Sequence, residues 1–483
     1  MKYYFSIFAA SIRNTHKNMY YKRIIDTHLQ EWATSTDRMP ILLRGALQIG
    51  KSTAVRHLAE QFEHYVEVNF EFKPDFIGLF KKDLDVKRII EEIEVIANTP
   101  IEAGKTLLFL DEIQECPEAI KALRYFREIT PDLHVIAAGS LLEFAIENLS
   151  GFGVGRIQSL FMYPMSFDEF LEACGEHFLI KARNKNTSGE SLSVATHDKL
   201  VYLMRRYMLV GGMPKAVAKW VETGKYLECQ KIHDSIIQSY EDDFSKYQSK
   251  ADPTLLQLTM RSIAIQNGNK FIYQRVGEAY RAVDVKKAIE ALILAGVVIP
   301  ITNTAANGFP LGSEADVNYR KLLLFDTGIT LRILQMNIDE TSEITEQIII
   351  ASAQDLVNKG AIAEQITGLE LIRYRNPNLR QELFYWVRKA NGAQSEIDFL
   401  TSSNQKIVPI EVKSGIQGGM KSLWLFMREK KLNKGIRVSL ENFGKFNHTD
   451  TRDNDAIREV RICPLYAISM LPRLLVHKLE ISE

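Results

Sequence analysis

Short apolar runs alternate with amphipathic segments along the first third of the chain. The apolar runs have the composition of buried strands, and they cover residues 41–43, 64–70, 106–110 and 132–140. The segments between them carry apolar side chains at the i, i+3, i+4 spacing of a helix, and they cover residues 53–62, 86–98 and 117–128. Unbroken apolar strands that alternate with helices are typical of a buried parallel sheet. This region is therefore predicted to be an α/β domain.

A second pattern begins near residue 250. Helices are expected at 255–266, 276–280 and 283–294, and strands at 297–301 and 320–325. Helices followed by a two-stranded hairpin are the order of a winged helix-turn-helix module. The candidate recognition helix carries Lys286 and Lys287, and Arg275 and Arg281 precede it. A DNA-reading face usually has more positive charge, so DNA binding and a role in packing or protein contact both remain open.

Composition sets few limits on function. The length of 483 residues suggests about three domains. Lys and Arg together number 60, as do Asp and Glu, so the zero net charge argues against a polybasic coat for nucleic acid. No apolar run approaches the roughly 20 residues of a membrane-spanning helix, and the four cysteines form no CxxC pair. We expect a cytoplasmic protein without a membrane partner, whose first domain begins at Met19 after an extension over 1–18.

Residues 40–62 read as strand, glycine loop and helix, and Gly45 to Ser52 spells G-x-x-x-x-G-K-S. The two glycines let successive backbone N–H groups point inward at a helix N-terminus, which makes an anion site. In this motif Lys51 reaches the β- and γ-phosphates, and the Ser52 hydroxyl is a Mg²⁺ ligand. The predicted nucleotide-binding residues here are Gly45, Ala46, Leu47, Gln48, Ile49, Gly50, Lys51, Ser52 and Thr53.

The sequence TLLFLDE, which ends in Asp111 and Glu112, has the form of a buried strand with two acids at its tip. Asp111 is expected to hold the Mg²⁺, and Glu112 to polarise the attacking water as the catalytic base. Ser140 ends a further buried strand, where it could contact the γ-phosphate or simply cap a helix. Arg156 follows a glycine-rich turn, and it is a candidate for an arginine that meets the phosphates in cis or across a subunit interface, or for a surface residue.

These stretches resemble a known family. LLRGALQIGKST, LFLDEIQECPEAIKALRYFRE, VIAAGSLLEFA and VGRIQSLFMYPMSFDEFLE are similar to the core of prokaryotic AAA+-type P-loop ATP-binding proteins. YMLVGGMPKAV and YEDDFSKY resemble the helical region that follows in that family, and LLLFDTGI and GAIAEQITGLEL resemble its C-terminal domain of unknown function. Leu47 departs from the family, whose members often have Arg there. Because the loop binds phosphate mainly through its backbone, this change leaves the expected chemistry intact.

The resemblance implies an α/β chain with four parts after the extension. An AAA+-type P-loop ATPase core is expected over 19–170, a helical lid over 171–250, and a winged-helix-like module over 251–345. A C-terminal α/β domain like a restriction endonuclease is expected over 346–483.

The tail contains SEIDFLTSSNQKIVPIEVKSG, which predicts a hairpin carrying Asp398, Glu411 and Lys413. An amphipathic helix over 360–372 precedes it and carries Glu364. The set resembles the PD-(D/E)XK nuclease core, and its form is similar to that of archaeal-type junction resolvases. The predicted metal ligands are Glu364, Asp398 and Glu411, with Lys413 as a catalytic residue that orients or deprotonates water beside the metal. Alternatively, Lys413 pairs with Asp398 and Glu411 in a salt-bridge cluster.

Two functions follow from these motifs. The leading hypothesis is an ATPase with ATP and Mg²⁺ as cofactors, whose nucleotide state controls a nuclease-like domain that acts on DNA. The alternative is an ATP-dependent molecular switch that assembles as an oligomer or binds a protein partner, with an inactive nuclease-like scaffold.

Overall fold

The structure of the chain, a computed structural model, describes residues 20–140, 155–186, 189–247, 251–336, 359–390, 393–413 and 419–476, together with Leu142 and Ile146. The chain divides into two compact units. The N-terminal unit consists of Met1–Met165, Ala291–Val297 and Asn376–Gln381, and the C-terminal unit of Ser166–Glu290, Val298–Arg375 and Glu382–Glu483. Within the described ranges, no helix is long and apolar enough to cross a membrane. The expected extension over 1–18 lies outside the described residues.

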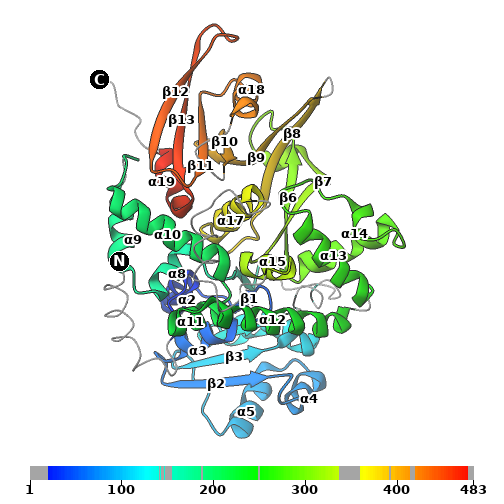
Figure 1. Cartoon of the computed structure of the whole chain (residues 1–483). Coiled ribbons are helices and arrows are strands. Elements are labelled where there is room, and N and C mark those ends of the chain that lie inside the picture. Colours follow the sequence, from blue (N-terminus) through cyan, green and yellow to red (C-terminus); the bar gives the residue numbers. More distant parts are fainter. Residues whose placement is uncertain are drawn as a thin grey trace. The chain divides into compact units, whose positions relative to one another are not determined.

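A five-stranded sheet forms the centre of the N-terminal unit (Figure 1). Its order is β2-β3-β4-β1-β5, and neighbouring strands pair in parallel. The strands are β1 (Ile41–Arg44), β2 (His64–Asn69), β3 (Thr106–Asp111), β4 (His134–Ala138) and β5 (Gln158–Phe161). All residues of β3 and β4 are buried, as in central strands covered on both faces. The sheet confirms the α/β class.

The helix α2 (Ile24–Thr34) precedes β1. The helices that connect the first four strands are α3 (Lys51–Ala59), α4 (Asp75–Lys82), α5 (Val86–Ala97) and α6 (Pro117–Ile129). The helices α4, α5 and α6 share one apolar core with β2 and β3, in which Phe80, Ile89 and Leu123 are buried. The helix α3 begins two residues before the expected start because Gly50, which has a left-handed backbone, is its N-cap.

The C-terminal unit begins with a run of helices. They are α8 (Phe167–Ala173), α9 (His177–Asn184), α10 (Val194–Val210), α11 (Pro214–Thr223), α12 (Tyr226–Asp243) and α13 (Pro253–Ile265). The described part of 171–250 is thus mainly helical.

An eight-stranded sheet of order β12-β13-β11-β10-β9-β8-β6-β7 follows in the C-terminal unit (Figure 1). Its strands are β6 (Val298–Thr304), β7 (Ala315–Leu324), β8 (Leu383–Ala390), β9 (Ala393–Ser403), β10 (Lys406–Val412), β11 (Lys434–Ser439), β12 (Gly444–Asp450) and β13 (Ala456–Pro464). The helix α17 (Lys359–Arg373) contacts β7 and β10, and α18 (Lys421–Glu429) contacts β9, β10 and β11. From α17 to β11 the element order is therefore α-β-β-β-α-β.

The hairpin expected as a wing belongs to this same sheet. The strands β6 and β7 pair antiparallel, and β6 also pairs in parallel with β8. The boundary expected at 345/346 lies outside the described residues, and the strands on either side of it share one sheet.

The prediction of a helix at 276–280 is wrong. A 3-10 helix at Tyr273–Arg275 precedes bends and turns there. Side chains at the end of α13 bind this backbone. The C-cap residue Gln266 bonds both the N–H and the carbonyl of Ile272, and Ser262 Oγ donates to the Arg275 carbonyl. These bonds compete with a helical ladder.

Candidate functional site

The predicted phosphate loop lies between β1 and α3 and depends on its two glycines. Gly45 has φ 143°, and a Cβ there would lie 2.3 Å from the Met162 carbonyl oxygen. Gly50 has φ 94° and caps α3 without a side-chain bond to the N–H groups of its first turn. Because no described side chain caps this helix end, its N–H groups and dipole favour an anion. This geometry fits a nucleotide phosphate.

Lys51 is almost fully buried at the start of α3, with 8% of its surface exposed. Its Nζ donates to the carbonyls of Gly45 at 2.9 Å and Ala46 at 2.8 Å. Burial lowers the pKa of Lys51 to about 8, although the nearby charges of Glu112 and Asp111 raise it. The ammonium is therefore held within the loop and titrates close to physiological pH.

Ser52 and Asp111 meet although they lie far apart in sequence. Ser52 Oγ is 3.2 Å from Asp111 Oδ1 and 3.1 Å from Oδ2, and Asn69 Nδ2 donates to Asp111 Oδ2 at 3.3 Å. Burial raises the pKa of Asp111, and the neighbouring Glu112 raises it further. A hydroxyl and a carboxylate together are hard oxygen ligands, so these residues fit the expected Mg²⁺. Asn69 was not predicted, because a polar residue at a strand end carries no specific signal.

Glu112 directly follows β3 with a left-handed backbone at φ 50°. Gln114 Nε2 donates to Glu112 Oε2 at 2.7 Å, and Ser140 Oγ lies 3.5 Å from the same oxygen. A Cβ on Gly139 would lie 2.1 Å from Gln114 Oε1. The structure thus brings Ser140 to Glu112, and it adds Gln114, which the sequence analysis missed.

Arg156 does not lie at this loop. It precedes β5, which pairs in parallel with β1, whereas the loop follows β1. Arg156 therefore lies at the N-terminal ends of these parallel strands, whereas the phosphate loop lies at their C-terminal ends. Arg156 Nε pairs instead with Glu128 at 2.5 Å. Within one chain, the structure does not support a contact between Arg156 and the phosphates.

Arg23 supports the loop from the segment before α2. Its side chain is buried, and it donates to the carbonyls of Ile49 at 2.9 Å and Tyr163 at 2.7 Å. It was missed because no motif marks an arginine so far from the loop in sequence.

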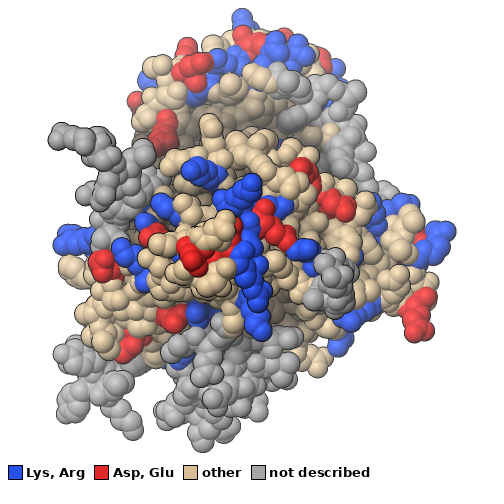
Figure 2. Space-filling model, turned by 90° about the horizontal axis from the view of Figure 1, so that it is seen from above, with Lys and Arg blue, Asp and Glu red and all other residues tan. Residues whose placement is uncertain are grey.

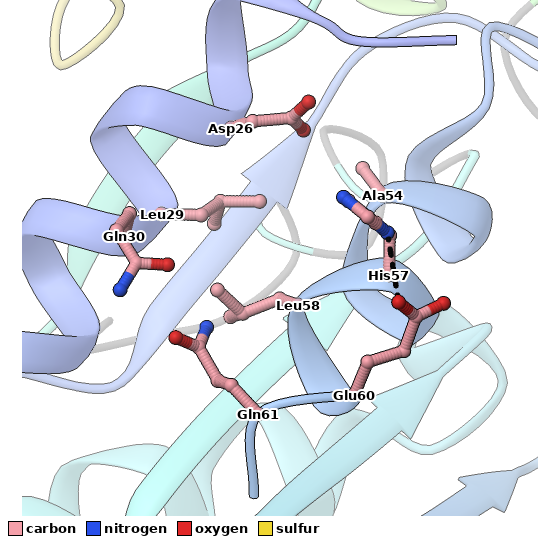
Figure 3. A pocket seen from close by; sticks show the side chains of 8 residues that line it. All are labelled: Asp26, Leu29, Gln30, Ala54, His57, Leu58, Glu60 and Gln61. Atoms are coloured by element: carbon pink, nitrogen blue, oxygen red, sulfur yellow. Dashed lines mark ion pairs between the residues drawn. The ribbon is translucent and has the colours of Figure 1, made fainter. Parts of the chain in front are cut away.

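A pocket of about 280 Å³ lies between α2 and α3 (Figure 3). It is lined by Asp26, Leu29, Gln30, Ala54, His57, Leu58, Glu60 and Gln61. Figure 3 shows the His57–Glu60 ion pair at its side, and Tyr20 stacks on His57 with ring centroids 4.0 Å apart. None of the predicted phosphate-loop residues lines this pocket.

The C-terminal set lies within the C-terminal unit. Asp398 on β9 accepts a bond from the Val412 N–H at 2.7 Å, and Lys413 Nζ pairs with Glu411 Oε1 at 2.6 Å. The pairing of β8 with β9 has a bulge at this position. Asp398 and Phe399 of β9 together lie opposite the single residue Tyr385 of β8. Such a bulge re-aims side chains.

Lys321 of β7, which the sequence analysis missed, reaches the same carboxylates. Its Nζ lies 2.7 Å from Glu364 Oε1 and 3.9 Å from Asp398 Oδ1, and it also pairs with Glu396. Burial raises the pKa of Glu364 to about 8, and burial with the charge of Asp398 raises that of Glu411 to about 7. Burial lowers the pKa of Lys321, but the surrounding carboxylates outweigh it and raise the pKa overall.

The expected metal set does not fit this arrangement. Across the described part of the chain, no group of three or more His, Cys, Asp or Glu side chains is placed to hold a metal ion. The ammonium of Lys321 lies among Glu364 and Asp398 instead. The arrangement corresponds to the salt-bridge alternative, but Lys321 rather than Lys413 is its central cation.

Comparison with protein families identifies part of the chain. Residues 37–171 match the AAA domain, so the chain contains an AAA+-type P-loop NTPase domain. Residues 202–340 match a domain of unknown function (DUF8612), and residues 359–459 match another (DUF4143). No curated protein matches the chain in sequence.

Several solved structures are similar over part of the chain. The ORC1 protein of Aeropyrum pernix in complex with DNA is 12% identical, over 67% of this chain and 95% of that chain, with a TM-score of 0.31. The Hsp104–ADP complex of S. cerevisiae is 15% identical, over 60% of this chain and 40% of that chain, with a TM-score of 0.24.

Proposed function

We propose that the protein binds ATP together with Mg²⁺ at the phosphate loop of its AAA domain and hydrolyses the ATP. The observation that carries this proposal is the contact between Ser52 and Asp111, with oxygens 3.1 and 3.2 Å apart beside the buried Lys51. It places a hydroxyl, a carboxylate and an ammonium at one uncapped helix end, the combination that a metal-bound triphosphate requires.

Each residue has a role that its position supports. The first N–H groups of α3 and the Lys51 ammonium would hold the β- and γ-phosphates. Ser52 and Asp111 would hold Mg²⁺, which when bound supplies positive charge to the phosphate oxygens. Glu112 would orient and polarise the attacking water, and Ser140 beside it would contact the γ-phosphate.

Phosphate release from ATP tests this assignment. Asp111→Asn is expected to lower the rate by about 100-fold or more, as loss of positioning in a metal-dependent site does. The control Asp132→Asn removes an exposed carboxylate outside the site and is expected to keep the wild-type rate. Equal rates for wild type and Asp111→Asn would contradict the proposal.

We further propose that the nucleotide state of the AAA domain controls the C-terminal unit. The α-β-β-β-α-β order from α17 to β11, with Asp398 and Glu411 on adjacent strands, supports a nuclease-like scaffold. The position of Lys321 among the acids favours the alternative, in which this scaffold is inactive and the protein is an ATP-dependent switch. Nicking of a supercoiled plasmid in Mg²⁺ or Mn²⁺ that Glu411→Ala abolishes would support the nuclease. A nucleotide-dependent change in oligomer size without nicking would support the switch.

DNA binding through the winged-helix-like module is a further proposal. Lys286 and Lys287 are exposed on α14 (Ala282–Leu294), whereas Arg281 pairs with Asp284 at 2.8 Å. On the face shown in Figure 2, Lys and Arg side chains are interspersed with Asp and Glu. Binding would thus be local, use few phosphate contacts and weaken as salt is added. A salt titration of DNA binding, compared between wild type and Lys286→Ala/Lys287→Ala, tests this.

A further inference from the structure

Lys321 is a fully buried lysine to which no part of the proposed function gives a task. Its ammonium donates to Glu364 Oε1 at 2.7 Å, pairs with Glu396, and lies 3.9 Å from Asp398 Oδ1. The Tyr385 ring centroid lies 5.3 Å from Nζ. An ammonium from β7 is thus enclosed by carboxylates from α17 and β9.

The carboxylates of this cluster outnumber its cations. Glu411 lies beside them and is 5% exposed. Its Oε1 pairs with Lys413, but its Oε2 is buried and has no hydrogen-bond partner within the described ranges. A buried carboxylate oxygen is costly to leave unpartnered. The acids therefore need a positive charge among them, and in the native chain the Lys321 ammonium supplies it.

We propose that the Lys321 ammonium is a built-in cation that replaces a divalent metal ion among Glu364, Asp398 and Glu396. In the native chain, the site is then closed to Mg²⁺ and Mn²⁺. Removal of the ammonium opens a latent divalent-cation site on the same oxygens.

The physical reason is competition for one position. An ammonium with three donors can bind several carboxylate oxygens at once, and it is attached to β7, so it has no entropy of association to lose. A divalent ion would have to displace it and leave it buried without a partner, which is strongly unfavourable. Without Lys321, the same carboxylates would repel one another, and a hard cation with oxygen ligands would restore the balance.

Lys321 also comes from a strand outside the α17–β11 segment that carries the acids. It lies on β7, which is joined to β8 only through β6. The β6–β7 hairpin is therefore joined to the nuclease-like segment in two ways, by the ion pairs of Lys321 and by the pairing of β6 with β8. This inference is independent of ATP hydrolysis, and its test does not involve nucleotide.

Mn²⁺ binding to the full chain, measured by electron paramagnetic resonance without nucleotide, tests the inference. Wild type is expected to bind no Mn²⁺ at the cluster. Lys321→Met is expected to bind about one Mn²⁺ per chain at least tenfold more tightly than wild type and to lose it on addition of Asp398→Asn. Added Mn²⁺ should also raise the melting temperature of Lys321→Met more than that of wild type, and Asp398→Asn should abolish the difference.

The control is Lys270→Met, because Lys270 lies opposite Lys321 in a β-bridge, while its ammonium lies over Tyr319 and not in the cluster. It should gain no Mn²⁺ site. If Lys321→Met folds poorly, Lys321→Gln removes the charge but keeps a hydrogen-bond donor for the carboxylates and leaves all three of them in place. The inference is overturned if wild type binds Mn²⁺ as tightly as Lys321→Met through Asp398. It is equally overturned if neither Lys321 variant gains Mn²⁺ binding or Mn²⁺-dependent folding.

Discussion

The buried position of Lys51 predicts two opposite pH dependences from one group. Burial lowers its pKa from 10.5 to about 8, so the nucleotide-free protein begins to lose this proton just above neutral pH. ATP binding needs the ammonium, so affinity should fall as pH rises. Folding is opposed by the buried charge, so the free energy of unfolding should rise over the same range. The sign follows from linkage, because the unfolded state binds more protons between pH 8 and 10.5.

The magnitudes follow from the same pKa. Between pH 7.5 and 9 the protonated fraction of a group with a pKa of about 8 falls about eightfold, so the Kd of ATP should rise about eightfold. The N-terminal unit should gain about 1 kcal/mol of unfolding free energy over this interval. The ATP phosphates contribute little, since phosphate esters have their second pKa near about 6.

Titration calorimetry with ATP and urea unfolding at pH 7.5, 8, 8.5 and 9 measure both trends. Lys51→Arg is the control, because arginine keeps its charge throughout this range. Its ATP affinity, even if lower, should not change with pH. A wild-type Kd that is constant from pH 7.5 to 9, or an equal slope in Lys51→Arg, would refute the reasoning.

Three further predictions concern single positions. Gly45→Ala should destabilise the N-terminal unit by about 2 kcal/mol or more, because Gly45 has φ 143° and the added Cβ would lie 2.3 Å from a carbonyl oxygen. The control Gly78→Ala in α4, whose Cβ meets nothing within 4 Å, should stabilise the unit by about 0.5 kcal/mol. A higher melting temperature for Gly45→Ala than for Gly78→Ala would contradict this prediction. Gly139→Ala should displace the Gln114 side chain from Glu112 and thereby lower kcat for ATP hydrolysis. The Kd of ATP should stay within about twofold, because the added Cβ clashes with Gln114 Oε1 and not with the phosphate loop. A weaker ATP affinity with an unchanged kcat, in binding and phosphate-release assays, would contradict this prediction. Arg156→Ala should leave the Kd of ATP for the monomer within about twofold, because Arg156 lies at the N-terminal ends of the parallel strands and the phosphate loop at their C-terminal ends; a tenfold loss in calorimetry would place it at the nucleotide.

Features that depend on neighbouring residues could be predicted from the sequence. The strand that ends in Asp111 and the loop before Lys51 are local patterns, and both lie where they were expected. Ser52 and Asp111 meet because β1 and β3, which have only β4 between them, run in parallel and end on the same side of the sheet.

Features that depend on distant side chains could not be predicted. Lys321 and Glu364 are 43 positions apart, and Arg23 and Ile49 are 26 apart. From the sequence alone, a lysine within a strand is expected to be a solvent-exposed cation. No sequence pattern therefore placed Lys321 beside the acids. Arg156 was wrongly expected near the phosphates within one chain for a similar reason. A glycine-rich turn before an arginine does not indicate at which end of the parallel strands the arginine lies.

The most direct test of ATP hydrolysis at the AAA domain is phosphate release by Glu112→Gln at saturating ATP and Mg²⁺, with ATP binding measured in parallel. The exposed neighbour Glu115 supplies the control Glu115→Gln. We predict a rate at least about 100-fold below wild type for Glu112→Gln, with ATP affinity retained, and a wild-type rate for Glu115→Gln. Hydrolysis by Glu112→Gln at the wild-type rate would contradict the account.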